Sequence, residues 1–212
     1  MSRAEDADRL DTDELGAALR GQHIGNRVVV LEETTSTNDV VAQLAPNHTA
    51  GLVVFAERQT AGRGQYGRRW DSAAHRGLWL SVLLRPGIAV SDSSKLTDLL
   101  AQTIAATVTE YASLSASIKP PNDVFVDGKK VAGVLVEMRV EPGGSYYAIA
   151  GMGLNVNHAL QDFPDELRET AGSIAMSLGR SVDRRAFAVA LLRQLDTRYR
   201  TFSESSAVRA AS

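Results

Sequence analysis

Residues 123–140 read DVFVDGKKVAGVLVEMRV, and this stretch decides the fold. Two apolar runs flank Asp127-Gly128, a dipeptide that supplies the positive φ angles of a tight hairpin turn. We therefore expect an antiparallel hairpin with strands at residues 123–126 and 130–140.

Further strands and helices are predicted on both sides of this hairpin. Short apolar runs predict buried strands at residues 27–32, 52–56, 78–84 and 146–150. Apolar residues at three- and four-residue spacing predict helices at 92–112 and 183–202, with shorter helices at 13–20 and 39–45. The hydroxyls of residues 34–37 and Asn38 are expected to cap the helix at 39–45. These elements predict an α+β fold, in which helices cover a mixed or antiparallel sheet.

The composition bounds the function. With 212 residues, of which 44% are hydrophobic, the chain suits one globular domain. A formal charge of −2 makes a general nucleic-acid binder a poor match, because such proteins usually carry a large basic excess. The lack of cysteine excludes disulfides, thiolate metal sites and thiol intermediates, and it fits a cytoplasmic protein. No apolar stretch is long enough to span a bilayer, so no membrane association is expected.

The chain is expected to hold one main domain, at residues 27–202. Residues 1–26 are interpreted as an N-terminal extension with one short helix, which is too little for a helix-turn-helix domain. Residues 203–212 are interpreted as a tail. We therefore expect no nucleic-acid partner.

A glycine- and arginine-rich loop, TAGRGQYGRRW at residues 60–70, is the first candidate site. Its three glycines let the backbone approach a ligand closely, and their N–H groups can surround an anion. Arg63, Arg68 and Arg69 add planar cations that suit phosphate or carboxylate. The competing interpretations are a solvated flexible loop and an RNA-binding arginine–glycine segment. The second is disfavoured because the motif is not repeated.

A second candidate site combines the motif KPPND at residues 119–123 with the lysines of the hairpin. Asp123 suits Mg²⁺, and Asn122 suits a phosphate or ribose oxygen. Lys119 and Lys130 are point charges suited to a polyphosphate, and Lys130 is expected to project from a rigid strand. Alternatively, Lys129 and Lys130 are ordinary edge-strand lysines that discourage aggregation.

A third, weaker motif is GMGLN at residues 151–155, where glycines inside a strand mark close packing or a close backbone approach. The sequence has no phosphate-binding loop ending in Gly-Lys-Ser/Thr and no nucleophilic-serine motif, and its four histidines lack metal-ligand spacing. The motifs thus describe a cation-rich, phosphate-handling site without a covalent nucleophile. Such a site suggests nucleotide-dependent activation of an acid.

Five motifs, in order and at the expected spacing over residues 27–202, resemble the biotin–protein ligase family. They are Thr35-Ser36-Thr37-Asn38, Gln59 with Gly62 to Trp70, Lys119 to Asp123, Lys130 to Gly133, and Gly151 to Asn155. The resemblance implies the class II aminoacyl-tRNA synthetase-like fold of biotin–lipoyl ligase catalytic domains. It also implies that biotin and MgATP give biotinyl-AMP, and that a lysine of a biotin carboxyl carrier protein then accepts the biotin.

The resemblance also implies a role for each matching position. The biotin-binding positions would be Ser36, Thr37, Asn38, Gln59, Arg63, Gly64, Gln65 and Lys130. The nucleotide-binding positions would be Arg68, Trp70, Lys119, Asn122 and Asn155, with Asp123 at the metal. Lys130 and Arg63 would be catalytic, because both would meet the carboxylate and the phosphate where charge develops.

The chain departs from the family pattern at three points. Pro120 stands where Trp is usual, so we expect the loss of an apolar contact and a stiffer loop. Gln65 stands where Arg is common beside the adenylate, so weaker retention of the adenylate is expected. The small C-terminal β-barrel domain of many relatives is expected to be absent or truncated, which lowers the expected efficiency with ATP and with the carrier.

Alternatives remain open beside this interpretation. A lipoate-type acyl ligase would use the same scaffold, but its Arg-Arg-x-Ser-Gly-Gly-Gly loop is not found, and octanoyl transferases need a cysteine. A biotin-sensing repressor would need a DNA-binding domain before residue 27. A biotin-binding pseudoenzyme would bind biotin without forming the adenylate. The sequence also leaves open whether the protein is a homodimer.

Overall fold

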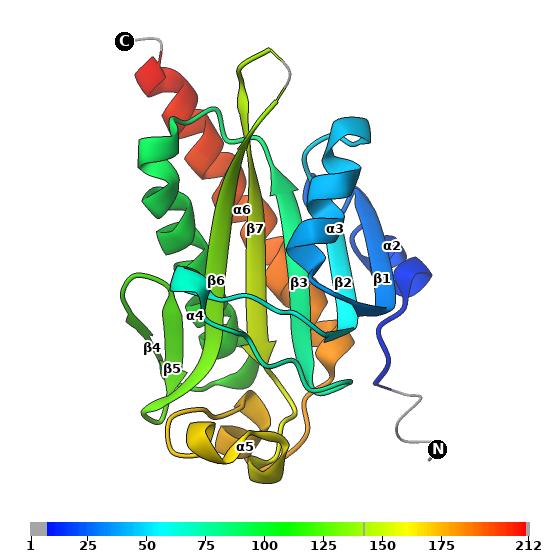
Figure 1. The fold of residues 1–212 in the computed structure, drawn as a ribbon, viewed down its shortest axis with the longest axis vertical. Coiled ribbons are helices and arrows are strands. Elements are labelled where there is room, and N and C mark those ends of the chain that lie inside the picture. Colours follow the sequence, from blue (N-terminus) through cyan, green and yellow to red (C-terminus); the bar gives the residue numbers. More distant parts are fainter. Residues whose placement is uncertain (1–7, 142, 211–212) are drawn as a thin grey trace.

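One mixed sheet organises the computed structural model, which describes residues 8–141 and 143–210 (Figure 1). Seven strands lie in these residues, in the order β1-β2-β3-β7-β6-β5-β4. They are β1 (Arg27–Thr34), β2 (Leu52–Gln59), β3 (Gly77–Leu84), β4 (Ala116–Lys119), β5 (Asp123–Val126), β6 (Lys129–Val140) and β7 (Tyr146–Asn155). Only β1 and β2 are parallel, and all other neighbours are antiparallel, which confirms the predicted mixed sheet.

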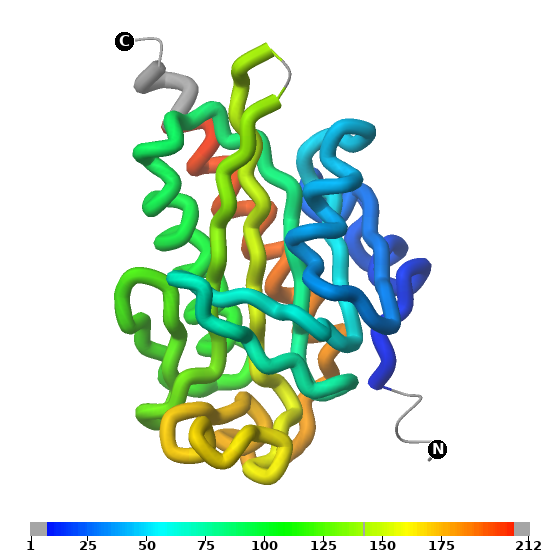
Figure 2. Tube along the Cα trace, in the orientation of Figure 1, coloured from blue at the N-terminus to red at the C-terminus, as the bar shows by residue number. Residues whose placement is uncertain are grey.

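Helices cover both faces of this sheet. They are α2 (Thr12–Ala18), α3 (Thr37–Leu44), α4 (Ser93–Ala112), α5 (Ile174–Leu178) and α6 (Arg184–Ala210). On one face α4 and α6 pack against each other over a large apolar core, whereas α3 covers part of the other face over a small one. The tube in Figure 2 shows the loop after β2 crossing the sheet on the same side as α3. The α3 side is therefore where the candidate loop lies.

The hairpin and the long helix α4 confirm the sequence predictions. β5 pairs antiparallel with β6, and the turn residues Asp127 and Gly128 have φ angles of 50° and 73°. α4 buries four residues of its apolar stripe, Leu96, Leu100, Ile104 and Val108, whereas Leu99 is partly buried and Tyr111 is 40% exposed. Both elements are specified by neighbouring residues, so a local pattern was sufficient to predict them.

Other predictions were wrong in detail. The strand predicted as buried at residues 27–32 is the edge strand β1, in which only Val28 is buried, because β-branched residues also suit sheet edges. The side chain of Ser36, the N-cap residue of α3, makes no capping hydrogen bond; Thr37 and Asn38 lie inside the helix and are buried. Helix α6 continues past Phe202 to Ala210. The short elements β4 and α5 were not predicted.

The described part of the N-terminal extension is packed into the domain. Leu10, Leu15, Leu19 and Ile24 join the large core. Arg184, which is fully buried at the start of α6, donates hydrogen bonds to the Glu57 carboxylate, to the Asp8 carboxylate and to the carbonyl oxygens of Gly77 and Asp8. These contacts tie the N-terminal segment to β2, β3 and α6. Within the described ranges, no helix has the length and hydropathy that a membrane span requires.

Candidate functional site

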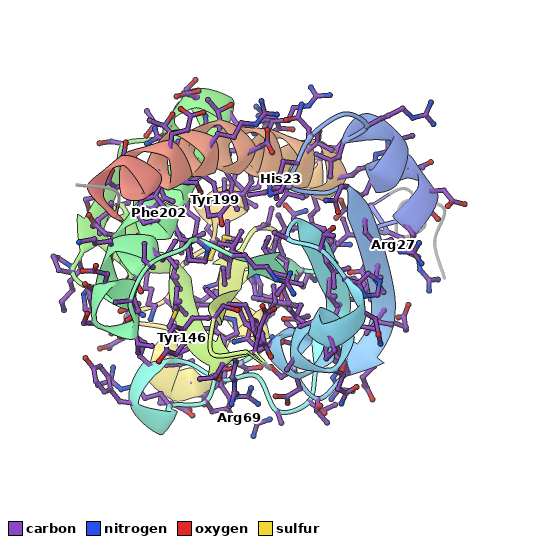
Figure 3. All side chains as sticks on the ribbon, turned by 90° about the horizontal axis from the view of Figure 1, so that it is seen from above. His23, Arg27, Arg69, Tyr146, Tyr199 and Phe202 are labelled. Carbon is purple, nitrogen blue, oxygen red and sulfur yellow. The ribbon has the colours of Figure 1, made fainter. Side chains whose placement is uncertain are left out.

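A cavity of about 460 Å³ lies on the α3 side of the sheet, between α3, the loop after β2 and the segment after β7. Figure 3 shows Arg69, in that loop, on the opposite side of the sheet from Tyr199 of α6. Every site residue predicted from the sequence lines this cavity: Ser36, Thr37, Asn38, Gln59, Arg63, Gly64, Gln65, Arg68, Trp70, Lys119, Asn122, Asp123, Lys130 and Asn155. The structure thus brings five separate motifs together. The role of each residue stays a prediction.

Glycines on β6 and β7 form the floor of the cavity. Gly133 and Gly153 face each other in the β6–β7 register, and the Trp70 indole lies over both. A Cβ atom at Gly153 would come within 2.5 Å of that indole, and one at Gly151 within 2.5 Å of Asn38 Oδ1. The missing side chains therefore make room for groups that reach over the sheet, which is the close approach that the third motif left open.

Uncharged polar groups line the end of the cavity next to α3. The backbone N–H and the hydroxyl of Thr37 both donate to Gln59 Oε1, at 2.8 and 3.1 Å. Ser81 Oγ donates to Asn38 Oδ1 at 2.5 Å, which orients the amide of Asn38. The Nδ2 group of Asn38 is buried and has no hydrogen-bond partner in the described structure. A buried donor without a partner is costly, so this amide is suited to a ligand acceptor.

The loop from Gly62 to Trp70 brings cations to the other end. It folds back on itself through hydrogen bonds from Gly64 N to Arg68 O and from Trp70 N to Gly62 O. The side chains of Arg68 and Arg69 make no ion pair within the described ranges and extend into solvent. Tyr66 at the tip is 86% exposed, with a φ angle of 60°. The loop thus offers free positive charge to an anionic ligand.

Lys130 projects from β6 into the cavity, as predicted. Its Nζ atom lies 2.7 Å from Asp123 Oδ1 and 5.2 Å from the centre of the Trp70 ring. Its backbone is fixed by the residues after β7, because Lys130 N donates to Thr170 O and Gly172 N donates to Lys130 O. The side chain of Lys129 does not line the cavity and donates instead to the carbonyl oxygen of Glu169. The two lysines therefore have different surroundings.

The side-chain amides of Asn122 and Asn155 donate to backbone carbonyl oxygens. Asn122 Nδ2 donates to Val134 O at 3.0 Å, and Asn155 Nδ2 donates to Gly172 O at 3.0 Å. Lys119 lies over the ring of Phe125, with its Nζ atom 5.9 Å from the ring centre. In this structure Asn122 and Asn155 thus fix the walls of the cavity beside the predicted nucleotide end.

Sequence reasoning missed the lower wall of the cavity, in the segment between β7 and α5. Phe163, Leu167, Glu169, Thr170 and Ala171 line the cavity there. The segment forms short turns without a helical or strand period, so no pattern marked it; the only signal is the pair of apolar residues at 163 and 167.

His158 supports this wall from below. Its buried ring stacks on Phe163 with ring centres 4.9 Å apart, and it meets the edge of Trp79 at 5.6 Å. Burial lowers the pKa of His158 to about 4, so the ring is neutral at pH 7. His158 is therefore a buried, neutral ring that supports the wall.

The comparisons agree with this geometry. A model of the biotin/lipoate A/B protein ligase family matches residues 30–157. The bifunctional ligase/repressor BirA of Bacillus subtilis is 35% identical over 195 residues, which cover 92% of this chain and 60% of that protein. The biotin–[acetyl-CoA-carboxylase] ligase of Mycobacterium tuberculosis is 35% identical over 216 residues, covering 91% of this chain and 73% of that protein.

A solved structure shares the architecture. The biotin protein ligase from Aquifex aeolicus in complex with biotin and ATP superposes with a TM-score of 0.74 at 30% identity, covering 84% of this chain and 72% of that one. This likeness confirms the predicted fold class. The chain spans about 60% of the length of the Bacillus protein.

Proposed function

The chain belongs to the biotin/lipoate A/B protein ligase family, and we propose that it joins biotin to AMP and then transfers the biotin to a lysine of a biotin carboxyl carrier protein. The observation that carries the proposal is that one cavity has both an uncharged hydrogen-bonding end and a cationic end. Biotin has the same polarity, with a neutral ureido ring at one end and a carboxylate at the other. Since the reaction consumes ATP, the cytoplasm is the proposed compartment.

The ureido ring is assigned to the α3 end of the cavity. A ureido group has one carbonyl acceptor and two N–H donors, which neutral amides and hydroxyls can match without an ionic partner. Asn38 Nδ2, buried and without a partner, is the donor we assign to the carbonyl. Ser36, Thr37 and Gln59 supply the remaining donors and acceptors from the same wall.

The first step is assigned to the cationic end. A carboxylate oxygen of biotin attacks the α-phosphorus of ATP, the bond from that phosphorus to the bridging oxygen breaks, and pyrophosphate leaves. Lys130 forms an ion pair with Asp123, and its ammonium group has three N–H donors with which to reach the carboxylate and the α-phosphate. A preorganised cation at this point stabilises the charge that develops. Arg68 and Lys119 are assigned to the phosphates, and Trp70, Asn122 and Asn155 to the nucleotide wall.

The second step needs a nucleophile from outside the chain. The neutral amine of the carrier lysine attacks the acyl carbon, the bond from that carbon to the phosphate oxygen breaks, and AMP leaves with the electron pair. The amine proton passes to solvent. This chain's residues hold the adenylate in place, so catalysis rests on positioning.

Magnesium does not fit the protein side of the site by itself. Asp123, the predicted metal ligand, is paired with Lys130, and no group of three or more acidic or histidine side chains suited to a metal occurs in the described ranges. Mg²⁺ commonly binds through one or two carboxylates together with substrate phosphates. We therefore assign the metal to the phosphates of the incoming nucleotide.

The test is exchange of labelled pyrophosphate into ATP at saturating biotin and MgATP. The proposal predicts exchange that depends on biotin and is not supported by lipoate or octanoate. Absence of exchange above a reaction without biotin would refute adenylation, and biotin binding without exchange would identify a pseudoenzyme. Exchange with lipoate in place of biotin would instead identify a lipoate-type ligase.

A further inference from the structure

The guanidinium of Arg63 is held by two acidic residues from different elements. Its Nη1 and Nη2 atoms donate to the two carboxylate oxygens of Asp39, in the first turn of α3, at 2.9 and 2.7 Å. Nη2 also lies 3.5 Å from Glu137 of β6, which is itself paired with Arg139 at 3.2 Å. The hydrogen bond from Arg63 lowers the pKa of Asp39 and raises that of Arg63, so both groups stay charged at pH 7.

This network connects the beginning of the candidate loop, at Arg63, to the body of the domain. Between Arg63 and Arg69, the backbone hydrogen bonds join loop residues only to one another. The next fixed point is Trp70, whose indole packs on the glycine floor. Among the described contacts, Arg63 is thus the residue between 63 and 69 whose side chain ties the loop to α3 and β6.

The charges of the network cancel. Asp39 and Glu137 balance Arg63 and Arg139, so Arg63 adds little net charge to the cavity. The uncompensated positive charge comes from Arg68 and Arg69. A two-point contact between carboxylate and guanidinium fixes geometry as well as adding energy. It engages Nη1 and Nη2 and leaves the Nε–H for a ligand.

We propose that Asp39 is a positioning residue for adenylation: it clamps Arg63, and through Arg63 it holds the loop of residues 62–70 over the cavity. The inference rests on the proposed function for its catalytic consequence, whereas the clamp itself is a property of the loop. Asp39 does not line the cavity, so it acts through Arg63 rather than on the ligand. A small error in the position of a bound carboxylate is enough to lower the rate of its attack.

Limited trypsin digestion tests the clamp without any activity. Arg63, Arg68 and Arg69 are the cleavage points, and cleavage in a closed loop depends on how often the loop opens. We expect Asp39→Asn, which keeps the size of the side chain but loses its charge, to speed cleavage in the loop about tenfold, and biotin to slow it. Asp39→Glu should restore much of the protection. The matched control is Glu33→Gln, which breaks an exposed pair between Glu33 of β1 and Arg58 of β2 and leaves the Asp39–Arg63 pair intact.

The catalytic consequence is measured on the same variants. We expect Asp39→Asn to lower kcat/KM for biotin in pyrophosphate exchange about tenfold, with unchanged Tm, and Glu33→Gln to leave it unchanged. Unchanged cleavage in Asp39→Asn would overturn the clamp, and so would slower exchange without faster cleavage. If the wild type shows no exchange, the proposed function fails, while the digestion still decides whether Asp39 holds the loop.

Discussion

The two faces of the sheet have different roles, and strand β7 contributes to both. On β7, Ala150 and Leu154 point into the large core under α4 and α6, while Gly151, Gly153 and Asn155 line the cavity. Because side chains alternate along a strand, one segment supplies stability on one face and a ligand floor on the other. The comparison predicts that substitutions two residues apart on β7 affect the same property, either stability or ligand binding, whereas substitutions at adjacent residues affect different ones.

The largest expected effect lies on the core face. Leu100 of α4 is fully buried in the large core. Leu100→Ala should lower the free energy of unfolding by about 2–5 kcal/mol, the usual range for deleting a packed leucine side chain. Urea denaturation measures this change. Below the unfolding transition the folded variant should bind biotin with the wild-type Kd; a large loss of affinity would mean that the two faces are not separable.

An acid-sensitive residue, His158, lies in the segment after β7, against Phe163 and Trp79. His158 has its pKa lowered from 6.5 to about 4 by burial, so the unfolded chain binds more protons than the folded one between these pH values. The stability that the neutral His158 ring contributes is therefore complete above about pH 6.5. It decreases as the pH is lowered from 6.5 to 4, and roughly 3 kcal/mol of the free energy of unfolding is lost below pH 4.

Replacing this histidine checks the sign. His158→Phe keeps a ring against Phe163 and removes the titration. Its free energy of unfolding, followed by urea titration from pH 7 to pH 4, should fall less steeply than that of the wild type. Parallel curves would show that His158 is not the group responsible.

The cavity face is tested most directly at the two consecutive lysines, Lys129 and Lys130. Lys130→Ala should slow biotin adenylation about 10²-fold, the usual scale for one preorganised donor, with a smaller loss of biotin affinity. Lys129→Ala is the matched control and should change adenylation little, because its side chain lies outside the cavity lining. Single-turnover kinetics separate the two quantities. Equal effects of the two substitutions would contradict the strand orientation.

The smallest expected effect is at the glycine floor. Gly153→Ala places a methyl group within 2.5 Å of Trp70, so the indole must shift away from β7. Overpacking of this kind costs about 1–3 kcal/mol, and here the cost should fall on ligand binding as well as on stability. Gly16→Ala, with no atom within 4 Å of the new methyl group, is the control. Calorimetric titration with biotin that shows wild-type affinity for Gly153→Ala would argue against a close-packed floor.

The sequence predicted the parts of the fold that local chemistry determines. Asp127-Gly128 specified its hairpin turn, and the spacing of Leu96 and Leu100 specified α4. The burial of β1 and the supposed cap at Ser36 were mispredicted, because both depend on neighbours far away in the chain.

The residues of the candidate site were predicted from its motifs, but the ion pairs between them were not. The motifs named the residues around the cavity, but a motif carries no information on which charges meet. The pairs Arg63–Asp39 and Lys130–Asp123 depend on how loop, helix and strands come together in space. The wall at Phe163 and Leu167 was missed because irregular turns leave no period in the sequence.

The central claim is that the carboxylate of biotin attacks the α-phosphorus of ATP in this cavity. It is tested most directly by supplying biotin with ¹⁸O in its carboxylate, together with MgATP and a biotin carboxyl carrier domain, and analysing the products by mass spectrometry. The account predicts one ¹⁸O atom in the AMP released as the carrier lysine is biotinylated, and none in pyrophosphate. Biotinylated carrier with unlabelled AMP, or label in pyrophosphate, would contradict it.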